Sequence, residues 1–105
     1  MRWVAWNLKS YPELALLYAI PNGGQRNRIV AAKLKAEGVK AGVPDLNLAV
    51  ARGGYHGLYI EMKVKPNKPT KKQLEWHEML REQGYRVEVC YGWEEGVAVL
   101  KGYLK

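Results

Sequence analysis

Apolar and polar residues alternate along the middle of the chain. Leu46, Leu48 and Val50 alternate with Asn47 and Ala49, directly after a Pro-Asp step. Side chains on a strand point to opposite faces with a period of two, so this alternation predicts a strand with one buried face. The proline favours a strand start here, because it biases the preceding residue towards extended backbone and cannot donate to a sheet ladder.

A second alternating segment follows a turn and predicts a hairpin. Arg52-Gly53-Gly54 supplies the turn, since glycine adopts the backbone angles that tight hairpins require. Four apolar residues share one face of the returning strand: Leu58, Ile60, Met62 and Val64. Three residues share its other face: Tyr59, Glu61 and Lys63. The acid and the lysine therefore occupy neighbouring positions on one face of the sheet.

The first third of the chain predicts a strand followed by a helix. Residues 3–9 indicate a helical turn, and the apolar run from Leu14 to Ile20 predicts a strand closed by the turn Pro-Asn-Gly-Gly at 21–24. Residues 25–37 are rich in Ala, Lys and Leu and stop before Gly38, the usual residue at a helix C-terminus.

A capping box predicts where the next helix begins. In Thr70-x-x-Gln73, the threonine side chain caps the helix and the glutamine reaches back to the backbone. The helix is expected to run to Gln83 and to end at Gly84. Three apolar side chains are expected in the core, with support from Trp76: Leu74, Met79 and Leu80.

The C-terminal segment predicts a last strand and a last helix. Four residues alternate as in a strand: Tyr85, Val87, Val89 and Tyr91. Four more have helical spacing on one apolar face: Trp93, Val97, Leu100 and Leu104. The element order favours an α/β fold, a central mixed four-stranded sheet flanked by helices, in one domain over residues 1–105.

Composition narrows the class of partner. The chain has 17 Lys and Arg against 10 Asp and Glu, a formal charge of +7. This balance favours a polyanion such as nucleic acid, although a merely soluble basic protein is an equal alternative. A single cysteine, Cys90, excludes an internal disulfide, and no apolar run approaches the roughly 20 residues of a membrane span. We expect a cytoplasmic protein with no membrane contact.

The candidate chemistry lies around the only aspartate of the chain. Asp45 opens one predicted strand, and Glu61 and Lys63 lie within the next. Two carboxylates suit Mg²⁺, which prefers one or two carboxylates plus water and phosphate oxygens, and the carbonyl of Met62 adds a third oxygen. Lys63 suits a role in orienting water or stabilising the charged phosphate. The pattern indicates a small metal-dependent nuclease.

Four sequence blocks resemble one nuclease family. They are Ala-Ile-Pro-Asn-Gly-Gly at 19–24, Gly-Val-Pro-Asp-Leu at 42–46, Ile-Glu-Met-Lys at 60–63 and Gln73. In this order they resemble the virus-type replication-repair nuclease (VRR-NUC) domain of the PD-(D/E)-x-K superfamily, over residues 12 to 104. The resemblance implies a restriction-endonuclease-like core and Mg²⁺-dependent cleavage of DNA, with Mn²⁺ able to substitute.

The resemblance also implies residue roles and an assembly. Asp45 and Glu61 would bind the metal, Lys63 would assist the attacking water, and Gln73 would support the site, although capping alone also explains Gln73. A lone domain of this length resembles the stand-alone phage members of the family, which are homodimers that cut four-way (Holliday) junctions. The resemblance therefore implies a homodimeric junction resolvase. The family often carries a further glutamate before its first strand, and Glu13 is the acidic residue of that region.

Basic residues and backbone amides are candidates for phosphate contacts. Amides of Asn22, Gly23 and Gly24 at a helix start would receive a DNA phosphate, with charge from Arg26 and Arg28. Four lysines flank the proposed metal site: Lys65, Lys68, Lys71 and Lys72. A solvated basic face is the alternative for both groups.

Two other functions stay open from the sequence. One is a non-catalytic nucleic-acid-binding module whose acidic residues are structural. The other is a monomeric enzyme that cuts flaps or nicks DNA. His56, His77 and Cys90 lack zinc-site spacing. A general base is an alternative role for His77, but the helix is expected to direct its side chain away from the site.

Overall fold

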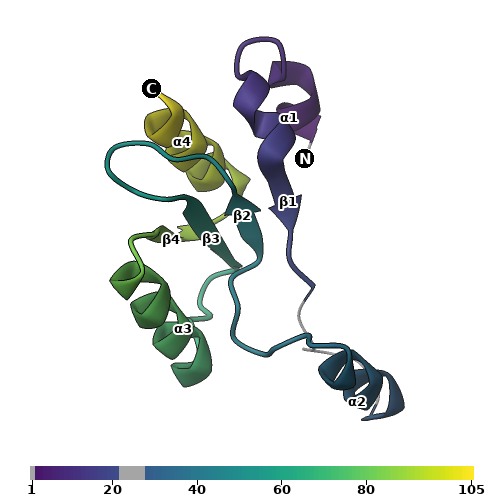
Figure 1. Ribbon diagram of the computed structural model, residues 1–105. Coiled ribbons are helices and arrows are strands. Elements are labelled where there is room, and N and C mark those ends of the chain that lie inside the picture. The colour runs from purple at the N-terminus through teal and green to yellow at the C-terminus, as the bar shows by residue number, and fades with distance from the viewer. Residues whose placement is uncertain (1, 22–27) are drawn as a thin grey trace.

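The computed structural model describes residues 2–21 and 28–105 of the chain. Helices and strands follow in this order: α1 (Arg2–Asn7), the 3₁₀ helix η1 (Pro12–Leu16), β1 (Leu17–Ala19), α2 (Arg28–Ala36), β2 (Leu46–Leu48), β3 (Leu58–Lys63), α3 (Lys71–Glu82), β4 (Arg86–Tyr91) and α4 (Trp93–Leu104). Figure 1 shows the sheet in the centre, with α2 standing apart from it. In the described part of the chain, no helix has the length and apolar content to cross a membrane.

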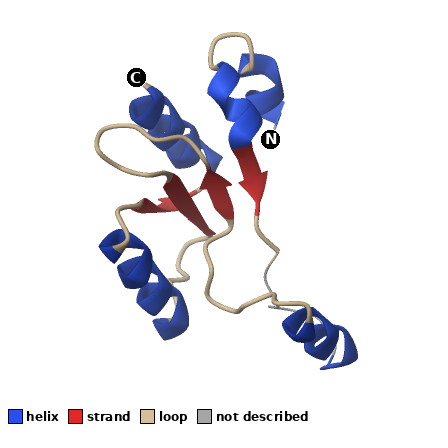
Figure 2. Ribbon diagram, viewed as in Figure 1, coloured by secondary structure: helices blue, strands red, loops and turns tan. Residues whose placement is uncertain are grey.

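The four strands form one mixed sheet in the order β1-β2-β3-β4. Strand β2 pairs antiparallel with both β1 and β3, whereas β4 joins β3 in parallel. Helices lie around this sheet (Figure 2), so the predicted α/β class with a mixed four-stranded sheet is confirmed. The parallel pair requires a crossover, and α3 provides it between β3 and β4.

The hairpin turn between β2 and β3 is where the sequence placed it. Arg52 and Tyr55 exchange both main-chain hydrogen bonds, at 3.2 and 2.8 Å. Gly53 and Gly54 between them have φ of +56° and +86°. Two consecutive positive φ angles define the tight turn that matches strand twist, so both glycines are needed here.

One face of the sheet carries the apolar core. Alternate residues of β2 and β3 point into it, among them Leu48, Leu58 and Ile60. Helix α4 packs on this face against β3 and β4, contributing Leu100 and Leu104. Val4 of α1 and Leu14 of η1 complete the same cluster.

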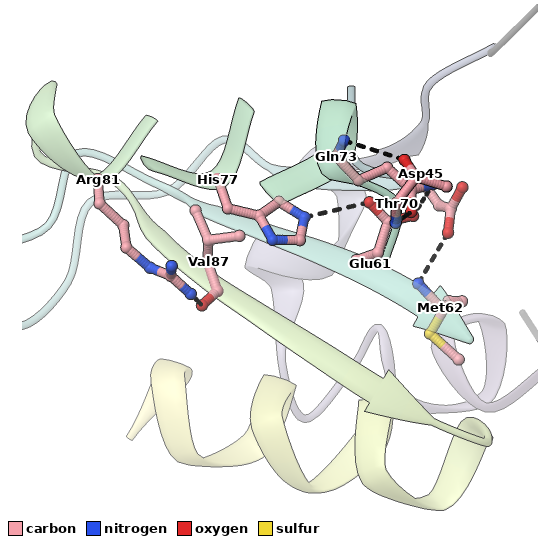
Figure 3. A network of polar contacts seen from close by, with 8 residues as sticks. All are labelled: Asp45, Glu61, Met62, Thr70, Gln73, His77, Arg81 and Val87. Atoms are coloured by element: carbon pink, nitrogen blue, oxygen red, sulfur yellow. Dashed lines mark hydrogen bonds and ion pairs between the residues drawn. The ribbon is translucent and has the colours of Figure 1, made fainter. Parts of the chain in front are cut away.

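The other face of the sheet is covered by α3. Figure 3 shows α3 and α4 on opposite sides of the sheet. Buried on the α3 side are Val87 and, between the helix and β3, the polar pair Glu61 and His77. Two buried titratable side chains in contact, on the face opposite the apolar core, mark a candidate functional region.

Two local predictions were wrong. Residues 14–16 belong to the 3₁₀ helix η1, which Pro12 begins, and only Leu17–Ala19 form a strand. A short apolar run has no period that separates helix from strand. On α3, Leu74 and Met79 are 50% and 49% exposed, so they do not lie in the core as predicted.

Candidate active site

Asp45 lies opposite Glu61 in the sheet. Leu46 pairs with Ile60 across β2 and β3, and continuing this antiparallel register by one residue sets Asp45 against Glu61. The Asp45 Oδ2 atom accepts a hydrogen bond from the Met62 amide at 2.7 Å, which holds the aspartate beside β3. The two carboxylates that the sequence predicted as metal ligands therefore come together on the α3 face.

The segment before β2 is tied to both neighbouring strands at Asp45. The Asp45 carbonyl accepts from the Ile20 amide at 2.7 Å, next to β1. Its side chain accepts from the Met62 amide of β3. Pro44, directly before it, has no N–H to donate to a neighbouring strand.

Two residues of α3 hold the carboxyl group of Glu61. Gln73 donates from Nε2 to Oε2 at 3.4 Å, and His77 Nε2 lies 3.2 Å from Oε1. Figure 3 shows both side chains reaching from the helix towards Glu61. Glu61 and His77 are each only 1% exposed. The orientation of the Glu61 carboxyl group is therefore fixed by contacts to each of its oxygens.

The surroundings of Glu61 disfavour its charged form. Burial, and then the nearby Asp45 carboxylate, raise the pKa of Glu61 to about 8, against the opposing influence of Lys63. Burial, with Arg81 and Lys63, lowers the pKa of His77. In the metal-free protein at neutral pH, Glu61 therefore keeps a proton and His77 is neutral. A bound cation would favour the ionised carboxylate.

Lys63 lies on the same face of β3 as Glu61, two residues further along the strand. It is half-buried. Its charge lowers the pKa of both Glu61 and His77, so it acts on the same small region as those two groups. The predicted grouping of Asp45, Glu61 and Lys63 on one side of the sheet is what the structure has.

Gln73 serves both roles that the sequence left open. Its Oε1 accepts from the Thr70 amide at 2.9 Å, while the Thr70 hydroxyl accepts from the Gln73 amide at 3.2 Å, a complete capping box. Its Nε2 is the donor to Glu61. A primary amide can do both because one end accepts and the other donates. The cap thereby fixes the direction in which the amide approaches the site.

His77 was missed as a site residue. The sequence prediction that it points elsewhere is wrong, since it lies against Glu61. Gln73 and His77 are four residues apart, and side chains at that spacing share one face of a helix. The sequence therefore held a signal for His77. Because Gln73 was assigned to the site, the residue one helical turn later could have been placed beside it.

The four flanking lysines lie around the N-terminus of α3. Lys65 and Lys68 lie in the loop before the helix, Lys71 and Lys72 lie in its first turn, and all four are exposed. No acidic residue occupies that turn. Positive charge at a helix N-terminus opposes the helix dipole, typically by about 0.3–1 kcal/mol per charge. Their placement is thus unfavourable for the isolated helix and suits phosphate binding.

The N-terminal phosphate candidates are only partly visible. Arg28 begins α2 and is exposed. Asn22, Gly23, Gly24 and Arg26 lie outside the described residues.

Glu13 lies at the far end of the β1–β2 pair from Asp45. Its carboxylate forms an ion pair with Arg52. Arg52 follows β2, whereas Asp45 precedes it. Because β1 is antiparallel to β2, Glu13 before β1 lies at the end of the pair where β2 finishes, and Asp45 lies at the other end. The strand length between these ends separates Glu13 from the two facing carboxylates.

The donor set fits Mg²⁺. Among the residues that the structure describes, there is no group of three or more His, Cys, Asp or Glu side chains that could form a metal cage. Asp45, Glu61 and the Met62 carbonyl instead present two carboxylates and one carbonyl oxygen. Mg²⁺ usually binds through one or two carboxylates and keeps several waters for exchange with phosphate oxygens.

Comparisons with known proteins identify the family of the chain. The family model of the VRR-NUC domain matches residues 2–94. A solved structure described as a VRR_NUC domain protein is 35% identical, with a TM-score of 0.78, covering 96% of this chain and 80% of that one. A comparison with curated proteins found no match. The fold, the sequence blocks and the facing carboxylates have one explanation: the chain belongs to the VRR-NUC domain family, and its function is of the nuclease type, with DNA as its partner.

Proposed function

We propose that the chain is a Mg²⁺-dependent, structure-selective DNA endonuclease that hydrolyses phosphodiester bonds as a homodimeric Holliday-junction resolvase. The observation that carries the proposal is the position of Asp45 opposite Glu61, with Lys63 on the same face of the sheet. Hydrolysis of a phosphodiester requires a positioned water and neutralised charge on the phosphate. A divalent cation held by the two carboxylates, with Lys63 beside it, would supply both requirements.

The metal would be held by Asp45, Glu61 and the carbonyl of Met62. When bound, Mg²⁺ would neutralise phosphate charge and lower the pKa of water, and Mn²⁺ would substitute because it accepts the same oxygen ligands. His77 and Gln73 orient the Glu61 carboxyl group, so they are positioning residues for this set.

Lys63 acts on the reacting phosphate. The residue lies on the same face of β3 as Glu61 and is half-buried, and charges that are partly buried are screened less than charges on the surface. It orients the attacking water or stabilises negative charge that develops on the phosphate. Further phosphates along the DNA strand are bound by these exposed residues: Arg28, Lys65, Lys68, Lys71 and Lys72.

A homodimer would supply two active sites for paired cuts in a symmetric junction. Helix α2 supports an assembled state, because none of its described residues is buried and Ile29 is 83% exposed. An exposed apolar helix is typical of an interaction surface. Light scattering under cleavage conditions tests this step: twice the 12.0 kDa chain mass supports the dimer, and a single chain mass favours a monomeric flap or nicking enzyme.

A cleavage assay on a synthetic four-way junction tests the activity. We expect paired nicks that require Mg²⁺ and are lost in Glu61→Gln and Lys63→Ala. Glu94→Gln and Lys101→Ala are the matched controls, since both residues are exposed on α4, on the opposite side of the sheet. Binding in EDTA without cleavage in Mg²⁺ or Mn²⁺ would instead identify a non-catalytic binding module.

A further inference from the structure

A cleft of about 620 Å³ lies between α2 and α3, beside the candidate active site. Leu34 of α2, Val39 of the following loop and the indole of Trp76 form its apolar part. Three lysines line it as well: Lys35, Lys40 and Lys72. Its volume is in the range of about 300–1,000 Å³ that small-ligand sites occupy.

The cleft and the active site use adjacent stripes of the same helix. Lys72 and Trp76 are four residues apart and line the cleft, whereas Gln73 and His77 are displaced by one residue and contact Glu61. Consecutive residues are about 100° apart around a helix, so the cleft and Glu61 lie on neighbouring sides of α3. Gln73 and His77, which contact Glu61, are not among the residues that line the cleft.

Gly42 fixes the wall of the cleft against α3. A Cβ atom at this position would lie 2.8 Å from Trp76 Cδ1 and 2.9 Å from Lys72 Cγ. The chain therefore passes directly over the indole edge and the lysine stem, three residues before Asp45. The segment held by this contact continues to Asp45, the residue directly before β2.

The lining selects a class of ligand. It contains an indole, aliphatic side chains and three lysines, with no acidic residue among its described members. A flat aromatic group stacks on an indole, and lysines bind phosphate as point charges. A nucleotide has both parts, whereas a purely apolar ligand would leave the lysines without counter-charge.

We propose that this cleft binds an unpaired nucleotide of the DNA substrate, with the base against Trp76 and the adjoining phosphates at Lys35, Lys40 and Lys72. The inference rests on the proposed function, since it supplies that active site with a substrate feature. A paired base is held in the duplex stack, so only an unpaired one enters without the cost of unpairing. The cleft thereby favours a junction in which a nucleotide is unpaired at the branch point, close to the cleaved bond.

A binding cycle in EDTA tests the cleft without cleavage. One DNA carries a single unpaired nucleotide at a branch, and a second carries an abasic residue at that position. Stacking of one base on an aromatic side chain contributes enough for the wild-type protein to bind the first DNA about 5- to 150-fold more tightly. Trp76→Ala should bind both DNAs with the abasic affinity, while Trp76→Phe should retain part of the preference.

The control is Trp6→Ala, because Trp6 lies on α1 and is 79% exposed. It should keep the full preference for the unpaired base. Equal wild-type affinity for the two DNAs would overturn the proposal, and so would a Trp76→Ala protein that still prefers the base. Lys35→Ala and Lys40→Ala should each reduce the slope of log K against log salt by about 0.7–0.9. An unchanged slope in both variants would overturn the phosphate assignment.

Photocrosslinking separates this site from other aromatic surfaces. A 5-iodouracil at the unpaired position should crosslink to Trp76, as mapped by mass spectrometry. Crosslinks only to Tyr18, the half-exposed tyrosine of β1, would place the base elsewhere and overturn the proposal. Loss of junction cleavage with retained base preference would contradict the proposed function while leaving this binding site intact. The two claims therefore fail by different measurements.

Discussion

His77 Nε2 lies 3.2 Å from Glu61 Oε1, and both side chains are almost completely buried. An acid and an imidazole at this distance form an ion pair only if the acid ionises and the imidazole takes a proton. Here burial raises the pKa of Glu61 and lowers the pKa of His77. The pair is therefore neutral in the metal-free protein. A cation bound beside Glu61 would favour loss of the proton from its carboxyl group.

The metal-free protein should lose stability as pH rises from about 4.5 to about 8. Unfolded Glu61 ionises near its ordinary pKa of 4.5, whereas folded Glu61 holds its proton until its raised pKa of about 8. Between these values the unfolded state binds fewer protons, so rising pH favours unfolding. The contribution of Glu61 to the free energy of unfolding in EDTA, measured by urea denaturation at pH 5 and pH 8, should therefore fall. His77 acts in the opposite direction below about pH 6.5, because its pKa is lowered in the folded protein.

Glu61→Gln isolates this contribution, because an amide does not titrate. The variant should show a smaller loss of stability between the same two pH values. Glu94→Gln, which changes an exposed acid on α4, should retain the wild-type loss. Parallel curves for the wild type and Glu61→Gln would show that Glu61 ionises in the folded protein as it does in the unfolded chain.

His77→Ala should weaken both the fold and the proposed metal site. A buried polar group left without its partner costs about 1–3 kcal/mol, and removal of the imidazole also leaves a gap under α3. Because His77 orients a proposed ligand, Mn²⁺ affinity should fall by about 10- to 100-fold. Calorimetry with Mn²⁺ measures this separately from stability.

His77→Gln is the variant that distinguishes orientation from packing. Its amide can form a hydrogen bond with the Glu61 carboxyl group in place of the imidazole, so it should recover part of the Mn²⁺ affinity. Equal affinity for Mn²⁺ in the wild type and in a folded His77→Ala protein would contradict the positioning role.

The strand positions could be predicted from the sequence because a period of two assigns each residue to a face. Asp45, Glu61 and Lys63 follow from that rule once the Pro-Asp step sets the start of β2. The helix α3 could not be oriented in the same way. Its apolar residues Leu74 and Met79 suggested a core-facing stripe, yet their side chains are half-exposed and the helix buries His77.

The reason lies in what covers α3. Its partner surface is a sheet face that carries the buried Glu61, and a polar group buried there needs polar partners from the helix. Gln73 and His77 meet that need, so polar residues take the inward stripe. Sequence periodicity gives the spacing of a stripe, but the chemistry of the opposing face decides which stripe turns inward.

Cleavage should proceed with Mg²⁺ or Mn²⁺ and fail with Ca²⁺. The proposed ligands Asp45, Glu61 and the Met62 carbonyl supply three oxygens, which leaves positions for water and phosphate in an octahedral ion. Ca²⁺ takes more ligands at longer distances, so it binds without placing water and phosphate correctly. Cleavage rates with each ion at equal concentration measure the effect, and equal rates in Ca²⁺ and Mg²⁺ would contradict the proposed donor set.

Gly42→Ala should destabilise the protein more than Gly38→Ala, although both glycines have similar backbone angles. Their φ values are +94° and +97°, where a side chain costs about 1–2 kcal/mol. A Cβ at Gly38 would meet no atom within 4 Å, whereas one at Gly42 would collide with Trp76 and Lys72. Overpacking of this kind adds about 1–3 kcal/mol, so urea denaturation should separate the two variants by that amount. Because the collision pushes the chain away from α3 just before Asp45, Gly42→Ala should also slow cleavage, while Gly38→Ala should lose stability alone; equal effects of the two substitutions would contradict the close contact with α3.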